Sequence, residues 1–251
     1  MNIVIPLAGR GSRFLKENIG YPKPLYKVLG KSVLEWSIST LNLPSKHCYF
    51  VALKYKNKKF NNEIENIIKK IVPNSTIIYL DSVTEGQAET CLKTKKYINN
   101  SDPLVITNCD QFLNWDYKGF IKHVKDTKVD GCVSLYKHKD VVLDQPSKYS
   151  FVKLNELGHA INFKEKYAIS NNSLNGIFYW KHGSDFVNSA EECINNRDKT
   201  NNEYFVSSTY NYLINKNKKI NTFLMGSNEY YSLGSPEEID KNYDKIARTI
   251  K

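Results

Sequence analysis

The chain has 251 residues, 41% of them hydrophobic, which suits one α/β domain with a sizeable core. Its formal net charge is +10, but the lysines are spread along the chain and mixed with asparagine, which indicates a solvated surface and argues against a nucleic-acid partner. The five scattered cysteines contain no Cys-x-x-Cys pair, which argues against a disulfide framework or a zinc site and favours reduced thiols.

Strands and helices alternate through the first half of the sequence, which predicts a mainly parallel sheet covered by helices. The expected helix over 33–41 has Ser32 as its N-cap, and the apolar residues of the expected helix over 63–72 form one stripe. The other expected elements of this half are the strands 3–7, 48–53, 76–80 and 104–107 and a helix over 85–98.

The second half is expected to add an antiparallel edge to the same sheet. Its expected elements are the strands 131–136, 174–180 and 220–225, a hairpin over 151–163, and helices over 203–214 and 236–246. No internal repeat or linker composition divides the chain. We therefore expect one domain over 1–251, built on a Rossmann-like, mixed and mainly parallel sheet flanked by helices.

Signals for targeting and for metal clusters are scarce. The first residues lack the cationic lead of a signal peptide, and no apolar run is long enough to span a bilayer. The five histidines are dispersed, which argues against a histidine metal cluster. We expect a cytoplasmic protein with no membrane partner.

The most informative motif lies at the N-terminus, where an apolar run leads into AGRGSRF (8–14) and then YPKPL (21–25). The two glycines let backbone N–H groups approach an anion closely, because no Cβ intervenes. Arg13 offers a planar fork of donors to phosphate oxygens, and Lys23 offers a compact charge positioned by its flanking prolines. These are the parts of a triphosphate cradle.

Other interpretations of the glycines fit less well. A plain surface turn would explain them without a ligand. A dinucleotide-binding fold requires a third glycine where Phe14 stands, and it requires an acid after the second strand, which here runs into Lys54. A P-loop is excluded because Gly-Lys-Ser/Thr does not close the turn.

The remaining pattern, Leu-Ala-Gly-x-Gly-x-Arg followed by Pro-Lys, resembles the signature of the nucleotidyltransferases that make sugar nucleotides and related CDP compounds. The resemblance implies the fold of that family and catalytic roles for Arg13, Lys23 and Asp110. The nucleotide-binding residues that it implies are Leu7, Ala8, Gly9, Gly11, Ser12, Arg13, Lys23, Glu85, Gly86, Gln87 and Asn108.

Within this set, the stretch TEGQAET (84–90) looks like part of a base pocket beside the glycine turn. Gln87 has both a donor and an acceptor, so it suits either cytosine or uracil. A plain helix start would explain the same stretch without a ligand.

Asp110 follows the apolar strand 104–107, and ligands of open α/β sheets bind beyond the carboxyl ends of the strands. A carboxylate there suits Mg²⁺ against phosphates, although an ordinary loop Asp would need no metal. The resembling family uses this Asp as a metal ligand and adds a second Asp before a Gly-Thr-Pro-like turn. Here Ser232 stands at that place, in YSLGSPEE (231–238). Either Asp110, waters and phosphates suffice for Mg²⁺, or another carboxylate contributes.

A Glu-Lys pair precedes a glycine-containing strand in the family, as NFKEK (162–166) does here. The resemblance implies that Lys166 binds the acceptor phosphate and that Glu165, Asn175 and Glu203 line the acceptor pocket. An exposed, charged hairpin end is the alternative interpretation. The nucleotide would then occupy the part up to about residue 130 and the acceptor the part from 131 to 251.

The compact length and the segments 86–90, 107–110 and 203–211 look closest to enzymes that join CTP to phosphoglutamine in capsular phosphoramidate synthesis. The acceptor phosphate would attack the α-phosphorus in line and displace pyrophosphate. No general base is needed, because a phosphomonoester has its second pKa at about 6. The alternatives are a UTP- or dTTP-dependent sugar-1-phosphate nucleotidyltransferase, a phosphocholine cytidylyltransferase with an aromatic cage, and a catalytically silent nucleotide-binding regulator.

Overall fold

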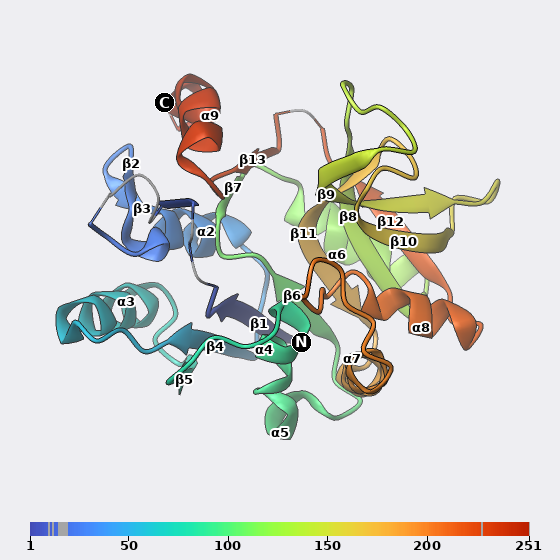
Figure 1. The fold of residues 1–251 in the computed structure, drawn as a ribbon, viewed down its shortest axis with the longest axis horizontal. Coiled ribbons are helices and arrows are strands. Elements are labelled where there is room, and N and C mark those ends of the chain that lie inside the picture. Colours follow the sequence, from blue (N-terminus) through green and yellow to red (C-terminus); the bar gives the residue numbers. More distant parts are fainter. Residues whose placement is uncertain (10, 12, 15–19, 227, 251) are drawn as a thin grey trace.

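The computed structural model describes residues 1–9, 11, 13–14, 20–226 and 228–250. Among these residues, nine strands form one mixed sheet. Its spatial order is β10-β9-β11-β6-β1-β4-β5, and β8 pairs with β11 and with β12 beside this row (Figure 1). The expected α/β class, with a mixed sheet flanked by helices, is confirmed.

The N-terminal half supplies the parallel part of the sheet. β1 (Asn2–Leu7) lies between β4 (His47–Leu53) and β6 (Leu104–Thr107), parallel to both, and β5 (Thr76–Leu80) continues the sheet beyond β4. Every residue of β1 is buried, as expected for a parallel strand covered on both faces.

Helices cover both faces of the sheet. Alternate residues of each strand point to opposite faces, so β1 contributes to two hydrophobic cores. Ile3 and Ile5 belong to one core and Val4 to the other. The first core includes residues of α2 (Val33–Leu41), α3 (Lys58–Ile71) and α6 (Tyr117–Asp126). The second includes residues of α4 (Gln87–Leu92), α5 (Lys95–Ile98), α7 (Gly183–Asn195) and α8 (Thr209–Asn215). No helix in the described part of the chain is long and apolar enough to cross a bilayer.

β11 (Asn172–Trp180) joins the two halves, since it runs antiparallel to β6 and to β8 (Gly131–Lys137). β9 (Pro146–Leu154) and β10 (Ala160–Tyr167) form the expected hairpin, and β12 (Ile220–Leu224) runs parallel to β8. The predicted strands of this half are confirmed, with small differences at their ends. The antiparallel strands β9, β10 and β11 extend the sheet beyond β6, beside its parallel part (Figure 1).

Short elements bring distant segments to that same edge. The 3-10 helix η1 (Lys23–Leu25) leads into a small hairpin of β2 (Lys27–Val28) and β3 (Lys31–Ser32). A separate antiparallel pair joins β7 (Gln111–Leu113) to β13 (Tyr230–Ser232), with Ser232 opposite Gln111. α9 (Pro236–Thr249) follows β13 and closes the described chain.

The expected single helix over 85–98 is wrong in its middle. α4 ends at Leu92, and α5 begins at Lys95. Between them, the hydroxyl of the buried Thr94 donates a 2.7 Å hydrogen bond to the Cys91 carbonyl. Such a local bond from a threonine side chain competes with a continuous helix.

The expected helix over 203–214 is wrong in its first half, because only α8 is helical there. Tyr204 instead pairs with the loop that precedes α4. Its N–H donates to the Glu85 carbonyl at 2.8 Å, and its carbonyl accepts from the Ala88 N–H at 3.0 Å. This pairing keeps the segment extended and places it against the expected base pocket.

Candidate active site

A cavity of about 910 Å³ opens at the carboxyl ends of β1 and β6, and both halves of the chain line it. The sequence-predicted residues among its lining are Leu7, Ala8, Gly9, Gly11, Arg13, Lys23, Glu85, Gly86, Gln87, Asn108, Asp110, Glu165, Lys166 and Glu203. Ser12 lies outside the described residues. Asn175 is the other exception, because it is not part of the lining.

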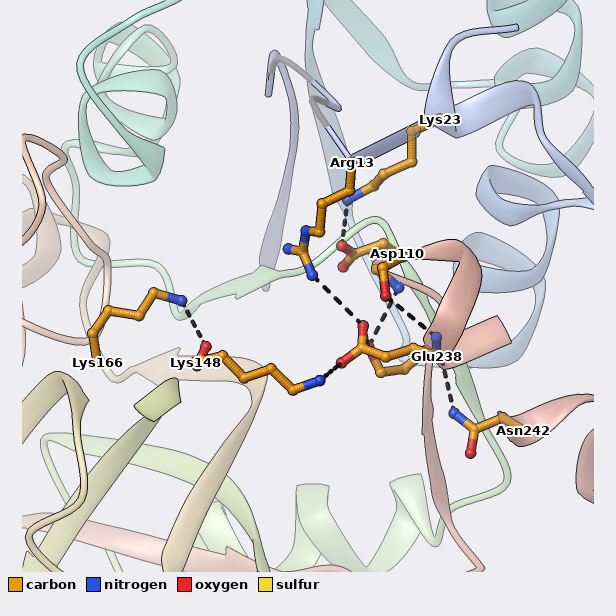
Figure 2. Close-up of polar contacts among 10 residues, drawn as sticks. Arg13, Lys23, Asp110, Lys148, Lys166, Glu238 and Asn242 are labelled. Carbon is orange, nitrogen blue, oxygen red and sulfur yellow. Dashed lines mark hydrogen bonds and ion pairs between the residues drawn. The ribbon is translucent and has the colours of Figure 1, made fainter. Parts of the chain in front are cut away.

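Lys23 and Asp110 form the centre of the cationic wall. Lys23 begins η1, and its Nζ donates a hydrogen bond to Asp110 Oδ2 (Figure 2). Burial is the largest single effect and lowers the pKa of Lys23, but the charge and hydrogen bond of Asp110, together with Cys109, raise that pKa above its usual value. Gly11 allows the close approach: it has φ +61°, and a Cβ there would lie 3.4 Å from Lys23 Cβ.

At the expected base pocket, two glycines allow other parts of the chain to lie very close to the backbone. Gly86 has φ +139°, and a Cβ there would overlap the backbone of Tyr204. Gln87 Nε2 donates a 2.7 Å hydrogen bond to Asn108 Oδ1, which joins the start of α4 to the end of β6. A Cβ at Gly176 would collide with the Asn108 side chain, so the missing side chain on β11 provides room for this pair.

The opposite wall carries a buried acid. Glu165 on β10 is 4% exposed, and the hydroxyls of Ser150 and Ser207 both donate hydrogen bonds to its Oε1. Burial raises the pKa of Glu165, and the two serine hydrogen bonds oppose that rise. The pocket wall therefore holds a carboxyl group that would gain from a cationic partner.

Lys166, the next residue, has φ +57° at a register shift of the β9–β10 pair. A non-glycine residue in this region costs on the order of 1–3 kcal/mol, and such strain concentrates at functional sites. Lys166 Nζ donates to the Lys148 carbonyl at 2.6 Å (Figure 2) and lies 5.6 Å from the centre of the Phe205 ring.

Asn175 faces away from this cavity. Side chains alternate along a strand, and the cavity takes residues 174, 176 and 178 of β11. Asn175 is 1% exposed on the other face, where its Oδ1 accepts a hydrogen bond from the Ser134 hydroxyl. The structure therefore does not bring Asn175 to the other expected acceptor residues.

Two charged residues of the cavity were missed by sequence reasoning. Glu238, near the start of α9, accepts a 2.9 Å hydrogen bond from Ser232 Oγ and lies 3.9 Å from Arg13 Nη1. Lys148 of β9 places its Nζ 3.6 Å from Glu238 Oε1 (Figure 2). The signal for Glu238 was a carboxylate six positions after Ser232, in the first turn of the next helix.

The acids of the cavity fit a divalent cation. A Cβ at Gly234 would lie 3.0 Å from Glu238 Oε2 and 3.2 Å from Asp110 Oδ2, so glycine leaves a small space between two carboxylates. Carboxylate oxygens are the ligands that Mg²⁺ prefers, and Mg²⁺ usually takes one or two of them together with waters and substrate phosphates. The described residues contain no group of three or more His, Cys, Asp or Glu side chains able to hold a metal.

Comparisons with known proteins agree with this architecture. The Bifunctional protein GlmU of Methanocaldococcus jannaschii is 25% identical over 149 residues, which are 57% of this chain but 35% of that protein. The nucleoside-diphosphate-sugar pyrophosphorylase of Vibrio cholerae superposes with a TM-score of 0.79 at 23% identity, covering 96% of this chain and 99% of that one. The inositol-1-phosphate CTP transferase of T. maritima gives a TM-score of 0.71 at 14% identity, covering 98% and 95%.

At these identities the two solved structures show a shared fold. The family is shown by a match to its model, since residues 3–246 match Nucleotidyl transferase. The chain therefore belongs to the Nucleotidyl transferase family.

Proposed function

We propose that this protein is a cytidylyltransferase that joins CTP to L-glutamine phosphate and releases pyrophosphate, for capsule modification. The observation that carries the proposal is one cavity with two unlike walls. One wall has the cations Arg13 and Lys23 beside Asp110, and the other has the buried Glu165 beside Lys166. The first wall suits a triphosphate, and the second suits a phosphorylated zwitterion.

In the proposed reaction, an oxygen of the acceptor phosphate forms a bond to the α-phosphorus of CTP. The bond from the α-phosphorus to the bridging oxygen breaks, and pyrophosphate leaves with that electron pair. Arg13 and Lys23 would bind the triphosphate and stabilise the charge that grows on the leaving group. Mg²⁺, when bound at Asp110, would neutralise phosphate charge. Before the nucleotide binds, Asp110 holds Lys23 at the cavity through their hydrogen bond.

The proposed nucleotide part is the first 130 residues or so, where Gln87 and Asn108 are hydrogen-bonded to each other. Because Gln87 Nε2 and Asn108 Oδ1 bond each other, Gln87 Oε1 and Asn108 Nδ2 remain as the acceptor and the donor that we assign to a base. Cytosine carries an amino donor and a carbonyl acceptor on its pairing edge, and uracil carries an N–H donor and carbonyl acceptors, so one donor and one acceptor suit either base and the substrate screen decides between them.

The proposed acceptor part lies from residue 131 onward. Lys166 would bind the acceptor phosphate, and Glu165 or Glu203 would bind the ammonium group. A partner cation would favour the ionised form of Glu165, whose pKa burial raises. The amide of the acceptor would need a partner other than Asn175, which faces the opposite side of β11.

A sugar 1-phosphate with UTP or dTTP is the second candidate. It is favoured by the likeness to a solved UDP-glucose pyrophosphorylase in complex with UDP-glucose, which has a TM-score of 0.75 at 18% identity. A hexose would call for several neutral hydroxyl partners rather than a buried acid. Phosphocholine is a third candidate, because Tyr149, Phe205 and Tyr230 add aromatic rings to the lining.

Pyrophosphate release, screened over CTP, UTP, dTTP, ATP and GTP, separates these candidates. Each nucleotide is tested against L-glutamine phosphate, phosphocholine, glucose 1-phosphate and other sugar phosphates, with Mg²⁺ present. We expect release with CTP and L-glutamine phosphate. Release with glucose 1-phosphate alone would replace the proposed acceptor, and nucleotide binding without turnover of any pair would indicate a regulator.

A further inference from the structure

Ser232 lies beside Asp110, which is 122 positions earlier in the sequence, because β7 and β13 pair with Ser232 opposite Gln111. The Leu233 N–H then donates to the Asp110 carbonyl at 2.8 Å. The segment 232–234 is therefore held against Asp110 by backbone bonds. In the resembling family this segment carries an Asp that binds metal, and here it carries a hydroxyl.

Glu238 brings a carboxylate to the same place from the next element. Its N–H donates to the Oγ of Ser235, the N-cap of α9, at 3.2 Å. Its side chain is held by Ser232 Oγ and reaches the cavity lining. A Cβ at Gly234 would lie within 3.0–3.3 Å of three oxygens, one each from Glu238, Asp110 and Ser232.

The cations around these two acids are the ones that a triphosphate would attract. Lys23 bonds Asp110, while Arg13 and Lys148 lie 3.9 and 3.6 Å from the Glu238 carboxylate. The Arg13 and Lys148 side chains are 60% and 51% exposed, whereas that of Glu238 is 11% exposed. Ion pairs with such exposed partners contribute about 0–1 kcal/mol, so phosphates can draw both cations away at little cost.

We propose that Glu238 is the second carboxylate ligand of the divalent cation at Asp110, in place of the family's Asp at position 232. Ser232 is then a positioning residue, which orients Glu238 through its hydroxyl. When Lys23, Arg13 and Lys148 turn to the phosphates, two adjacent carboxylates lose their counter-charges, and a divalent cation between them restores the balance. The inference rests on nucleotidyl transfer in this cavity and is independent of the base and the acceptor.

The test measures Mn²⁺ binding by the decrease of the free Mn²⁺ EPR signal as protein is added to Mn²⁺ and CTP, relative to a blank of Mn²⁺ and CTP without protein. Four proteins are compared: wild type, Glu238→Gln, the double variant Ser232→Asp with Glu238→Gln, and Glu237→Gln. Glu237 is exposed on the same helix and is not part of the cavity lining, so its substitution makes the same charge change without removing a carboxylate of the cavity. Gln at 238 keeps an acceptor for the Ser232 hydroxyl, and circular dichroism verifies that each variant is folded.

We expect Glu238→Gln to weaken Mn²⁺ binding about tenfold or more, given that loss of a partner that only supports a metal ligand already costs 10–100-fold. Ser232→Asp should restore most of that loss, and Glu237→Gln should bind as wild type does. Equal Mn²⁺ affinity in the Glu238→Gln and Glu237→Gln variants would overturn the inference. So would a wild type that binds no Mn²⁺.

Anomalous scattering from crystals grown with Mn²⁺ and CTP locates the ion independently. The expected peak contacts carboxylate oxygens of both Asp110 and Glu238; a peak on Asp110 with Glu238 still on Arg13 and Lys148 would overturn the inference. The substrate screen is separate from both measurements. Loss of CTP specificity there would leave the Glu238 site intact, and a metal site without Glu238 would leave nucleotidyl transfer intact.

Discussion

Lys23 Nζ donates a hydrogen bond to Asp110 Oδ2 across 87 residues of sequence. The bond joins the 3-10 helix after the glycine turn to the loop after β6. It holds a cation and an anion side by side at the carboxyl end of the sheet, where α/β proteins bind their ligands. The triphosphate cradle predicted from the first 25 residues is thus joined to an acid in a loop that is distant in the sequence.

Replacing either cradle cation should reduce turnover without unfolding the protein. Arg13→Ala and Lys23→Ala should each lower kcat by about 100-fold or more, the loss typical of one preorganised contact to developing charge. Lys125→Ala, an exposed lysine on α6, is the matched control and should retain wild-type turnover. Steady-state kinetics with thermal melts checks this, and variants within a few-fold of wild type would remove Arg13 and Lys23 from the cradle.

Asp110→Asn should abolish activity that depends on Mg²⁺, since it removes the central carboxylate. Ser232→Ala should be milder: it removes the 2.9 Å bond that orients Glu238 but leaves both carboxylates in place. Activity measured over a Mg²⁺ titration should therefore show no recovery for Asp110→Asn and recovery at higher Mg²⁺ for Ser232→Ala. Equal and complete losses would contradict the purely positioning role of Ser232.

The glycine on β11 provides a paired test of the base pocket. Gly176→Ala should displace Asn108, break its bond to Gln87 and raise the KM for the nucleotide. Gly158→Ala is the control, because Gly158 has φ +79° against +84° at Gly176 but no atom within 4 Å of a Cβ. Both should lose about 1–2 kcal/mol of stability from the left-handed backbone. A nucleotide KM that changes equally in both variants would show that Asn108 is not part of the pocket.

Glu165 gives stability a defined pH dependence. Its folded-state pKa is raised above 4.5 by burial, so its contribution is complete below the unfolded-state pKa and is lost as pH rises through the folded-state pKa. Glu165→Gln keeps the acceptor for Ser150 and Ser207 but does not titrate. The variant should therefore gain stability relative to wild type as pH rises from 4.5 toward neutrality. Urea unfolding at several pH values measures this difference, and a constant difference would contradict it.

Glu165, together with Glu203, is also expected to determine which acceptor the protein binds. Glu165→Gln and Glu203→Gln should raise the KM for L-glutamine phosphate far more than the KM for CTP. Sites built to pair a polar group reject analogues that lack it by up to about 10⁴-fold. Steady-state kinetics with each substrate varied in turn measures the split; equal effects on both substrates would move these residues out of the acceptor pocket.

Local sequence signals predicted the elements that depend on local chemistry. Ser32 caps α2 and forms a capping box with Glu35, so the start of that helix could be read from four residues. Contacts across the fold decided the rest. The extended segment at Tyr204 depends on hydrogen bonds to Glu85 and Ala88, which no local pattern encodes.

In the site, too, contacts across the fold decided what local sequence patterns could not predict. Asn175 belongs to a strand whose neighbours line the cavity, but side chains alternate, so a one-residue difference in register decides which face it takes. The sequence did not predict a role for Glu238, because an acid in the first turn of a helix is common. Only the pairing of β7 with β13 brings Glu238 near Asp110. The amphipathic helix α6 and the helix α7, which has no side-chain N-cap, were also absent from the sequence prediction.

The most direct test of the proposed reaction is ³¹P NMR of wild-type protein with CTP, Mg²⁺ and L-glutamine phosphate. The proposal predicts loss of the phosphomonoester and triphosphate signals, with equal growth of pyrophosphate and of a new diphosphate linking CMP to glutamine phosphate. Lys23→Ala protein should give neither product at a comparable rate. Unchanged L-glutamine phosphate, beside rapid conversion of glucose 1-phosphate with UTP or dTTP, would contradict the proposal.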